Sequence, residues 1–585
     1  MGRSPDRVPV REHTEKEESA LIVKELREII EESLVEAAKA GEIPDPGGVE
    51  YVLERPRHKA HGDWATNAAL VLASRAGRNP REIAAALVPH LEERACRPGK
   101  GRDYPVLSAV EVAGPGFINF TLDRDRVLLE LMRVAGEGES YGRWNLGGGL
   151  PVLVEFVSAN PVGPLHVGHG RWAALGDALC NLLEAVGYDV DREFYLNDYG
   201  TQMEVFAASV EARYLELAGR EVEFPAEGYH GSYVMDIARV LMEEDGGKLV
   251  DAPPEERRAE LGERAYRLML ERIRESLDNF GVRFDNWFSE RELHASGAVL
   301  EEIRRLREEG LAYEKDGAVW MATSRFGDDK DRVLLRSNGA PTYFAADIAY
   351  HLNKLSRGYR HLINIWGADH HGYVRRMQAA LEAKGYPGVL EVILGQLVNL
   401  KRGGEPVRMS KRTGEMVTFD ELVEEVGRDV ARYLFLTRSQ DTALDFDIQL
   451  AVQESMENPV YYVQYAHARI CSILRYGLGR GVELSEEIPD LQTLRRLGEE
   501  EEMDLALKIF EFEELIRDAA LDRAPHRLTR YLEELAAAFH LFYNRHRVIS
   551  DDAELTAARL FLVRCTLQVL RNGLSILGVS APESM

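Results

Sequence analysis

Two histidines in one short segment have the spacing expected of a phosphate-binding site. His166 and His169 lie three residues apart, after the apolar run 152–157 and a turn that includes Pro164. Residues three apart at the start of a helix face the same way, and a helix N-terminus presents free amide groups to an anion. Gly168 allows a close approach of the backbone. The segment predicts contact with a nucleoside triphosphate; two histidines that only cap a helix are the alternative.

A basic segment lies 245 residues further along the chain (411 − 166 = 245). Arg408 and Lys411 are three residues apart, with Met409 between them and glycines on both sides. Phosphoryl transfer is stabilised by positive groups placed next to the negative charge that develops on the phosphates. A glycine-flanked loop can close over a nucleotide and then open to release the product. A solvated basic loop is the alternative, but the histidine segment favours the phosphate hypothesis.

Strands that alternate with helices must position these residues. Apolar runs predict strands at 152–157, 190–196, 361–366 and 392–398, and a helix spans 168–185. Such alternation predicts a parallel, doubly wound sheet, whose ligands bind outside the carboxyl ends of the strands. The histidine segment lies at such an end.

The bulk composition predicts several domains. At 585 residues the chain is too long for one core, and 45% hydrophobic with 29% charged residues is ordinary for a globular protein. No apolar stretch approaches the ~20 residues of a membrane span, and no signal peptide is evident, so we expect a cytoplasmic protein. The four scattered cysteines argue against disulfides. The net charge of −26 is mild evidence against a nucleic-acid partner.

Two further segments carry a resemblance to a known family. Residues 155–166 read EFVSANPVGPLH and residues 194–202 read FYLNDYGTQ. With the segments at His166 and Lys411, they resemble arginyl-tRNA synthetases, class I enzymes whose signatures are usually written HIGH and KMSKS. Val167 and Arg408 stand where the family often has isoleucine and lysine, and both replacements are conservative. The resemblance covers about residues 20–585.

The resemblance implies an arginine–tRNA ligase. Such an enzyme joins L-arginine to the 3′ end of tRNA(Arg) through an arginyl-adenylate and releases AMP and pyrophosphate. His166 and His169 would stabilise the triphosphate, and Lys411 with Arg408 would bear on the pyrophosphate. No general base is needed, because the carboxylate of arginine is already ionised at neutral pH. The family further implies that activation needs bound tRNA, and that Mg²⁺ accompanies ATP without a dedicated protein metal site.

Candidate ligand-binding residues follow from the same resemblance. A guanidinium needs fixed carboxylates and planar acceptors. The arginine-binding residues would be Glu155, Asn160, Tyr343, Asp347 and Asp369. The ATP-binding residues would be Pro164, His166, Gly168, His169, Gly367, Asp369, His370, Met409 and Lys411. For each isolated acid, an ion pair or helix cap is the alternative. The sequence Asp369-His370-His371 resembles a metal cluster, but its place after a strand better suits contact with adenosine.

The last third of the chain has a helical pattern in which aromatic and basic residues alternate. Aromatic rings with neighbouring arginines suit unstacked single-stranded bases, although most such rings simply form a core. The resemblance implies an anticodon-binding bundle. Its candidate tRNA-binding residues are Tyr461, Gln464, Tyr465, Arg469, Tyr543, Asn544 and Arg547.

The predicted organisation is a multidomain α/β protein. It comprises a flexible tail (1–18), an N-terminal α+β module that contacts tRNA (19–123), a connector (124–149), a Rossmann-like catalytic domain (150–455) with a helical insertion at about 201–306, and an all-α bundle (456–585). The partners would be tRNA(Arg), L-arginine and ATP, with no membrane, and the family implies a monomer. A silent tRNA-binding relative, a small-molecule ligase and a synthetase for another amino acid remain alternatives.

Overall fold

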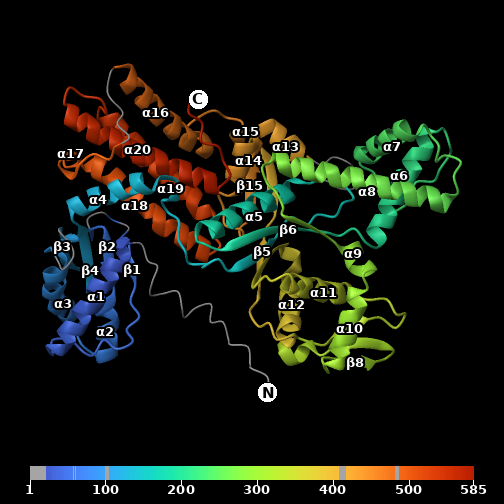
Figure 1. Cartoon of the computed structure of the whole chain (residues 1–585), viewed down its shortest axis with the longest axis horizontal. Helices are drawn as coiled ribbons and strands as arrows, with labels where there is room; N and C mark the ends of the chain where they lie inside the picture. The colour runs from blue at the N-terminus through green and yellow to red at the C-terminus, as the bar shows by residue number, and fades with distance from the viewer. Residues whose placement is uncertain (1–20, 57, 59–60, 99–103, 408–416, 481–486) are drawn as a thin grey trace.

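The computed structural model of the chain describes residues 21–56, 58, 61–98, 104–407, 417–480 and 487–585. A small module near the N-terminus lies at one end of the molecule and the helices α6 to α8 lie at the other, as Figure 1 shows. The parallel sheet lies between these two ends, with the C-terminal bundle beside it.

The N-terminal module is an antiparallel sheet covered by helices. Its strands are β1 (Leu53–Glu54), β2 (Trp64–Thr66), β3 (Leu107–Ala113) and β4 (Phe117–Leu122), and its helices are α1 (Leu21–Lys39), α2 (Ala68–Ala76) and α3 (Pro80–Ala95). The strand order is β1-β2-β4-β3. The predicted α+β character and the strand at 117–122 are confirmed.

The central sheet has five parallel strands. They are β5 (Pro151–Glu155), β6 (Asp189–Leu196), β7 (Asn286–Ser289), β11 (His361–Gly367) and β12 (Leu390–Gly395), in the order β12-β11-β5-β6-β7. Helices α5 (Val167–Ala185), α11 (Tyr343–Ser356) and α12 (His371–Ala383) complete the crossovers. The predicted doubly wound sheet is confirmed. Because β5 has β6 on one side and β11 on the other, the strand order reverses at β5, where such folds bind their ligands.

The strand expected at 392–398 is present in the central sheet, but its predicted bounds are wrong. β12 ends at Gly395, and β13 (Val398–Arg402) belongs to a different sheet. A Cβ on Gly395 would lie 1.9 Å from the Trp172 indole, so only glycine lets the chain pass α5 there. The backbone of Gln396 then bonds to Gln440, which carries the chain out of the central sheet.

The insertion expected at about 201–306 is mostly helical, as predicted, but it also contains one strand of the central sheet. Helices α6 (Thr201–Leu217), α7 (Ser232–Asp245) and α8 (Pro254–Asn279) project from the sheet (Figure 1). The strand β7 follows them and pairs with β6, so it belongs to the central sheet. Two short helices come next, α9 (Glu290–Ala295) and α10 (Ala298–Glu308). An antiparallel sheet, which the sequence did not indicate, is then formed by β8 (Ala312–Lys315), β9 (Ala318–Met321) and β10 (Arg332–Leu335).

A small sheet joins the central domain to the C-terminal third. It pairs β13 with β14 (Glu405–Pro406) and with β15 (Leu444–Asp447). Helices α13 (Phe419–Val426), α14 (Arg428–Phe435) and α15 (Ile448–Ala451) surround it. The bundle follows with α16 (Pro459–Gly479), α17 (Leu491–Leu494), α18 (Glu500–Leu521), α19 (His526–Arg545) and α20 (Ala553–Ile576).

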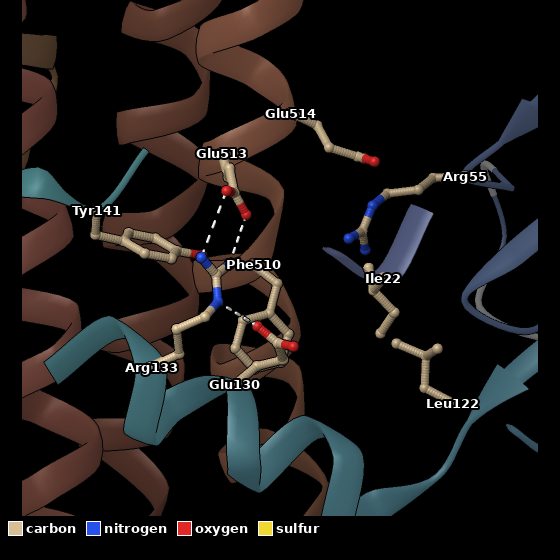
Figure 2. A pocket seen from close by; sticks show the side chains of 9 residues that line it. All are labelled: Ile22, Arg55, Leu122, Glu130, Arg133, Tyr141, Phe510, Glu513 and Glu514. Atoms are coloured by element: carbon tan, nitrogen blue, oxygen red, sulfur yellow. Dashed lines mark hydrogen bonds and ion pairs between the residues drawn. The ribbon is translucent and has the colours of Figure 1, made fainter. Parts of the chain in front are cut away.

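The segment expected as a connector packs against the bundle. Helix α4 (Arg124–Glu137) contacts α18 and α20. Figure 2 shows the joint, where Arg133 of α4 bonds to Glu130 and forms two hydrogen bonds, 3.4 and 2.5 Å long, with Glu513 of α18. Arg55 of the N-terminal module lies in the same cavity, 3.6 Å from Glu511. The N-terminal module is thus attached to the bundle.

A buried arginine joins the central domain to the insertion and the bundle. Arg432 of α14 is fully buried and donates 2.5 Å to the Asp177 carboxylate of α5. It also donates to the carbonyl oxygens of Phe280, just after α8, and Leu577, just after α20, each at 3.1 Å. One side chain therefore ties together four helices from three parts of the molecule.

Candidate active site

The chain leaves β5 through a turn with strained backbone. Val157 and Ser158 have φ values of 66° and 42°, in the left-handed region that a β-branched residue such as valine rarely adopts. Backbone bonds hold the turn, since the Ser158 amide donates to Phe156 and its hydroxyl accepts from the Tyr195 amide at 3.2 Å. Such strain costs about 1–3 kcal/mol per residue and is found mainly at functional sites. The turn directs the following residues across the carboxyl end of the sheet.

The two histidines form the N-terminus of α5. His166 is the N-cap, and each ring accepts from the other residue's backbone amide, at 3.2 and 3.3 Å. The rings stack with 3.5 Å between their centroids. A Cβ on Gly168 would lie 3.0 Å from the His166 ring, so glycine suits this position. The histidines do cap the helix, and they also lie at the switch point of the sheet, where the helix N-terminus favours an anion.

The start of α13 lies directly beside the histidine segment. Thr418 pairs with His166 in an isolated bridge, and the Phe419 amide donates to the Leu165 carbonyl at 2.9 Å. The candidate residues Arg408, Met409 and Lys411 lie outside the described residues. The structure nevertheless brings the segment that follows them into contact with the segment of His166.

Asp347, Glu290, Tyr373 and Tyr195 form an acidic cluster, here named the acidic pocket. Half-buried Asp347 of α11 accepts a hydrogen bond from the Tyr373 hydroxyl. Glu290, only 2% exposed at the start of α9, bonds to Tyr195 of β6. Burial, with a smaller contribution from the charge of Glu155, raises the pKa of Asp347 to about 7, although the bond from Tyr373 and the charge of Lys354 oppose the rise. Burial and the charge of Asp347 likewise raise the pKa of Glu290 to about 7.

The raised pKa values of Asp347 and Glu290 indicate that nearby positive charge does not balance the negative charge of the acidic pocket. Desolvation and like charges both disfavour ionised carboxylates, and an incoming cation relieves both effects. Perturbed carboxyl groups that converge in a polar pocket are typical of a binding site. The sequence did not reveal Glu290, because it directly follows the short strand β7, which periodicity did not detect. The only available signal was an acid after an aromatic strand segment, Asn286–Ser289.

The remaining candidate arginine ligands lie in different environments. Glu155 is 6% exposed at the end of β5 and bonds to Lys354. Asn160 donates 2.6 Å to the Gln202 side chain. Tyr343, the first residue of α11, is 66% exposed and lies one turn before Asp347. The side chain of Asp369 is 83% exposed, so it lies at the rim of the site.

The candidate nucleotide residues after β11 also lie at this rim. Asp369 and His370 form an ion pair of 3.6 Å in a short 3₁₀ turn. The Asp369 carboxylate lies over Gly367, where a Cβ would be 2.5 Å from it. Pro164 lies two residues before His166 and is half-buried. Among the described residues, no group of three or more His, Cys, Asp and Glu side chains is arranged to hold a metal ion.

Four of the candidate tRNA-binding residues, Tyr461, Tyr465, Arg469 and Tyr543, form a cluster on α16 and α19. Arg469 lies over the rings of Tyr465 and Tyr543, at 5.1 and 5.7 Å. Tyr461 stacks with Tyr465 at 6.3 Å. Asn544 and Arg547 are exposed. The arrangement offers aromatic and cationic surface together.

Gln464 differs from the rest of that set. It is 8% exposed, and its amide nitrogen donates to Asp429 at 3.0 Å and to the Ser580 carbonyl at 2.9 Å. These bonds join α16 to α14 and to the C-terminal segment. Its amide nitrogen is thus engaged in contacts within the protein.

No described helix is long and apolar enough to cross a membrane.

Family models match three consecutive parts of the chain. Residues 24–122 match the arginyl tRNA synthetase N-terminal domain, and residues 145–473 match the catalytic domain of class I (R) tRNA synthetases. Residues 463–585 match the DALR anticodon binding domain. The catalytic match contains the central sheet, the histidine segment and the acidic pocket.

Known proteins with high similarity share one name. The chain is 53% identical to the arginine–tRNA ligase of Carboxydothermus hydrogenoformans over 94% of this chain and 97% of that protein. It is 51% identical to the arginine–tRNA ligase of Moorella thermoacetica over 96% of this chain and 100% of that protein. The solved arginyl-tRNA synthetase of Thermus thermophilus superposes with a TM-score of 0.71 at 26% identity, covering 96% of this chain and 100% of that one. With the site described above, these matches establish that the chain belongs to the arginyl-tRNA synthetase family.

Proposed function

We propose that the chain joins L-arginine to the 3′ end of tRNA(Arg) with ATP. The observation that carries the proposal is the acidic pocket of Asp347 and Glu290, which lies at the same edge of the sheet as the His166–His169 pair. A guanidinium carries a permanent charge and five donors, so buried carboxyl groups and tyrosine hydroxyls complement it. Tyr343, Asn160 and Glu155 contribute further contacts, with Asn160 and Glu155 at the α-amino end.

In the first step, the arginine carboxylate attacks the α-phosphate of ATP. A carboxylate oxygen–phosphorus bond forms, and the bond from the α-phosphorus to the oxygen bridging to the β-phosphate breaks, so pyrophosphate leaves. His166, His169 and the amide groups at the start of α5 stabilise the triphosphate. Lys411 and Arg408 stabilise the departing pyrophosphate, and Met409 contributes to ATP binding. ATP enters as its Mg²⁺ complex, and Gly367, Asp369 and His370 contact the adenosine.

In the second step, the 2′-hydroxyl of the terminal ribose attacks the carbonyl carbon of the adenylate. The ester bond to the ribose forms, the carbonyl carbon–phosphate oxygen bond breaks, and AMP leaves. The bundle at 456–585 binds the anticodon through Tyr461, Tyr465, Arg469, Tyr543, Asn544 and Arg547, while module 19–123 contacts the tRNA elsewhere. The protein acts as a monomer in the cytoplasm.

ATP–pyrophosphate exchange tests this function directly. Purified protein is assayed with each of the twenty amino acids, with and without total tRNA. We expect exchange with arginine alone, and charging of tRNA with labelled arginine. Exchange with another amino acid contradicts the assignment of the acidic pocket. No exchange under any condition favours a silent tRNA-binding relative.

A further inference from the structure

A fully buried lysine lies directly behind Glu155. Lys354, near the end of α11, has no exposed surface. Its Nζ lies 2.5 Å from Glu155 Oε2, 3.3 Å from Asn364 Oδ1 and 3.9 Å from Glu193 Oε1. Lysine is almost never fully buried unless paired, because desolvating its charge costs several kcal/mol. Its position therefore calls for a structural or functional reason.

The two oxygens of Glu155 have different environments. Oε2 accepts hydrogen bonds from Lys354 at 2.5 Å and Asn364 at 3.0 Å, and it lies 3.1 Å from the Tyr350 hydroxyl oxygen, whose single hydrogen donates to Glu193 over the shorter distance of 2.6 Å. The bond described at Oε1 is a longer one, 3.3 Å, from the Ser158 hydroxyl. A carboxylate offers about two acceptor sites per oxygen. The Oε2 side is therefore fully used within the protein, and Oε1 is the oxygen with remaining capacity.

A directed chain of hydrogen bonds extends from Glu155 to Asp347. Burial lowers the pKa of His351 to about 3, so its imidazole is neutral. Its Nδ1 bonds to the Asp347 carbonyl at 2.8 Å and must donate, which leaves Nε2 to accept from the Asn364 amide at 3.2 Å. Asn364 in turn accepts from Lys354 through Oδ1. The orientation of each group is thus fixed by the next.

Glu193 completes the charge balance around Lys354. Its carboxylate accepts from Tyr350 at 2.6 Å and Arg357 at 2.6 Å. Two carboxylates, Glu155 and Glu193, therefore face two cations, Lys354 and Arg357. Loss of the lysine charge leaves one cation for both carboxylates, and Glu155 loses the shorter of the two bonds that fix its Oε2.

We propose that Lys354 is a positioning residue for substrate recognition, which holds Glu155 so that Oε1 faces the α-ammonium group of arginine. The inference rests on the proposed function. Asp347 lies seven residues earlier on α11, two turns or about 10 Å away. A single helix therefore organises both ends of the substrate, the guanidinium through Asp347 and the α-ammonium through Lys354.

The Lys354→Met variant tests this role with a substrate analogue. The probe is 5-guanidinopentanoate, which is arginine without its α-amino group, used as a competitive inhibitor of exchange. We expect the KM for arginine to rise by about tenfold or more, as for a lost charge-assisted contact, with the KM for ATP unchanged. The inhibition constant of the analogue changes by less than about twofold, because the analogue makes no α-ammonium contact. Equal losses for arginine and the analogue, or no loss for either, overturn the proposal.

Double variants separate positioning from folding. If Lys354 acts through Glu155, the double variant Glu155→Gln/Lys354→Met binds arginine no more weakly than Glu155→Gln alone. Fully additive losses contradict this. Asn364→Ala removes a donor without removing a charge, so it tests the same selectivity loss if Lys354→Met does not fold. Unchanged selectivity in Asn364→Ala then counts against the proposal.

A matched control lies on the next helix. Lys384, just after α12, also pairs with two glutamates, Glu302 at 3.0 Å and Glu309 at 2.8 Å. We expect Lys384→Met to leave the selectivity for arginine over the analogue unchanged. Absence of exchange in the unmodified protein refutes the proposed function itself. Exchange in the unmodified protein with equal losses in Lys354→Met refutes only the role of Lys354.

Discussion

Asp347 and Glu290 are carboxyl groups whose charge depends on what occupies their pocket. Burial raises the pKa of each to about 7, with smaller contributions from Asp347 and Asp198 for Glu290 and from Glu155 for Asp347. A bound guanidinium reverses this effect, because an opposite charge favours the ionised form. The pocket therefore changes its protonation in the range of neutral pH.

The first prediction concerns the pH dependence of arginine binding. Folding raises the pKa of Asp347 and of Glu290. Each group therefore stabilises the folded, arginine-free protein at pH values below its unfolded-state pKa, and this stabilisation is lost as pH rises through about 7. Arginine binds the ionised form, so its KM falls as pH rises from 6 to 8. The increase in melting temperature on adding arginine should also be larger at pH 8. An arginine KM independent of pH, measured by exchange at saturating ATP, contradicts the prediction.

The second prediction concerns Glu290, which only the structure revealed. Glu290→Gln keeps the shape but removes one charge facing the guanidinium, so kcat/KM for arginine should fall by about tenfold to a hundredfold. The KM for ATP should stay the same. Glu292→Gln, an exposed residue on the same helix, is the matched control and should behave like the unmodified protein. Equal effects of the two variants exclude the assignment of Glu290.

At the scale of elements, one arginine joins helix α5 to the loops that precede β13 and β15. Arg171 of α5 is 1% exposed and donates to the carbonyl oxygens of Gln396, Ser439 and Thr442, each at 2.9 Å. Burial lowers the pKa of its guanidinium to about 10, so it remains charged at neutral pH. Gln396 precedes β13 and Thr442 precedes β15, and these two strands pair in parallel. From β13 the chain continues toward residue 407.

The third prediction follows from these three bonds. Arg171→Met leaves three carbonyl groups without this donor and should destabilise the protein by about 3 kcal/mol. Because the sheet of β13 is then less firmly joined to α5, kcat for exchange should fall more than the KM for arginine rises. Arg375→Met is the control. Arg375 also donates to two carbonyl groups, but these belong to Phe326 and Gly327 and not to the loops before β13 and β15. Its kcat should be unchanged in the same assay.

At the scale of the whole molecule, buried polar contacts join the parts of the chain. Arg133 and Glu513 hold α4 against the bundle (Figure 2), and burial raises the pKa of Glu513 while Arg133 opposes the rise. Arg432 joins α14, α5 and the ends of α8 and α20. A Cβ on Gly578, whose φ is +67°, would lie 2.1 Å from the Arg432 guanidinium, so only glycine fits against it.

The fourth prediction concerns this junction. Arg432→Met removes the partner of a buried carboxylate, a change that costs about 3–5 kcal/mol when the other charge remains. The cost should be at the low end, because Asp177 also pairs with Arg192 at 3.3 Å. Chemical denaturation should report the loss. Arg428→Met, one turn earlier on α14 and exposed, should cost less than about 0.5 kcal/mol. Similar costs for both variants contradict the role of Arg432 as a junction.

The sequence alone determined the local features of this protein. Apolar runs and turn formers predicted β5, β6, β11 and α5 within one or two residues, because strand and helix periodicities are local properties. The motif around His166 and Gly168 predicted the switch point and the family. The candidates Glu155 and Asp347 came from the resemblance, and their roles remain predictions.

Only the tertiary structure decided which distant residues meet. Glu290 became a candidate because β7 pairs with β6 after the long excursion of α6 to α8. Lys354 and Arg171 are ordinary basic residues in the sequence, and their roles follow from complete burial against partners 199 and 225 or more residues away. Burial and long-range pairing set hydrogen bonds and pKa values, and neither is encoded in a local pattern. The sequence therefore identified the chemistry, and the packing of the chain decided which side chains are positioned for it.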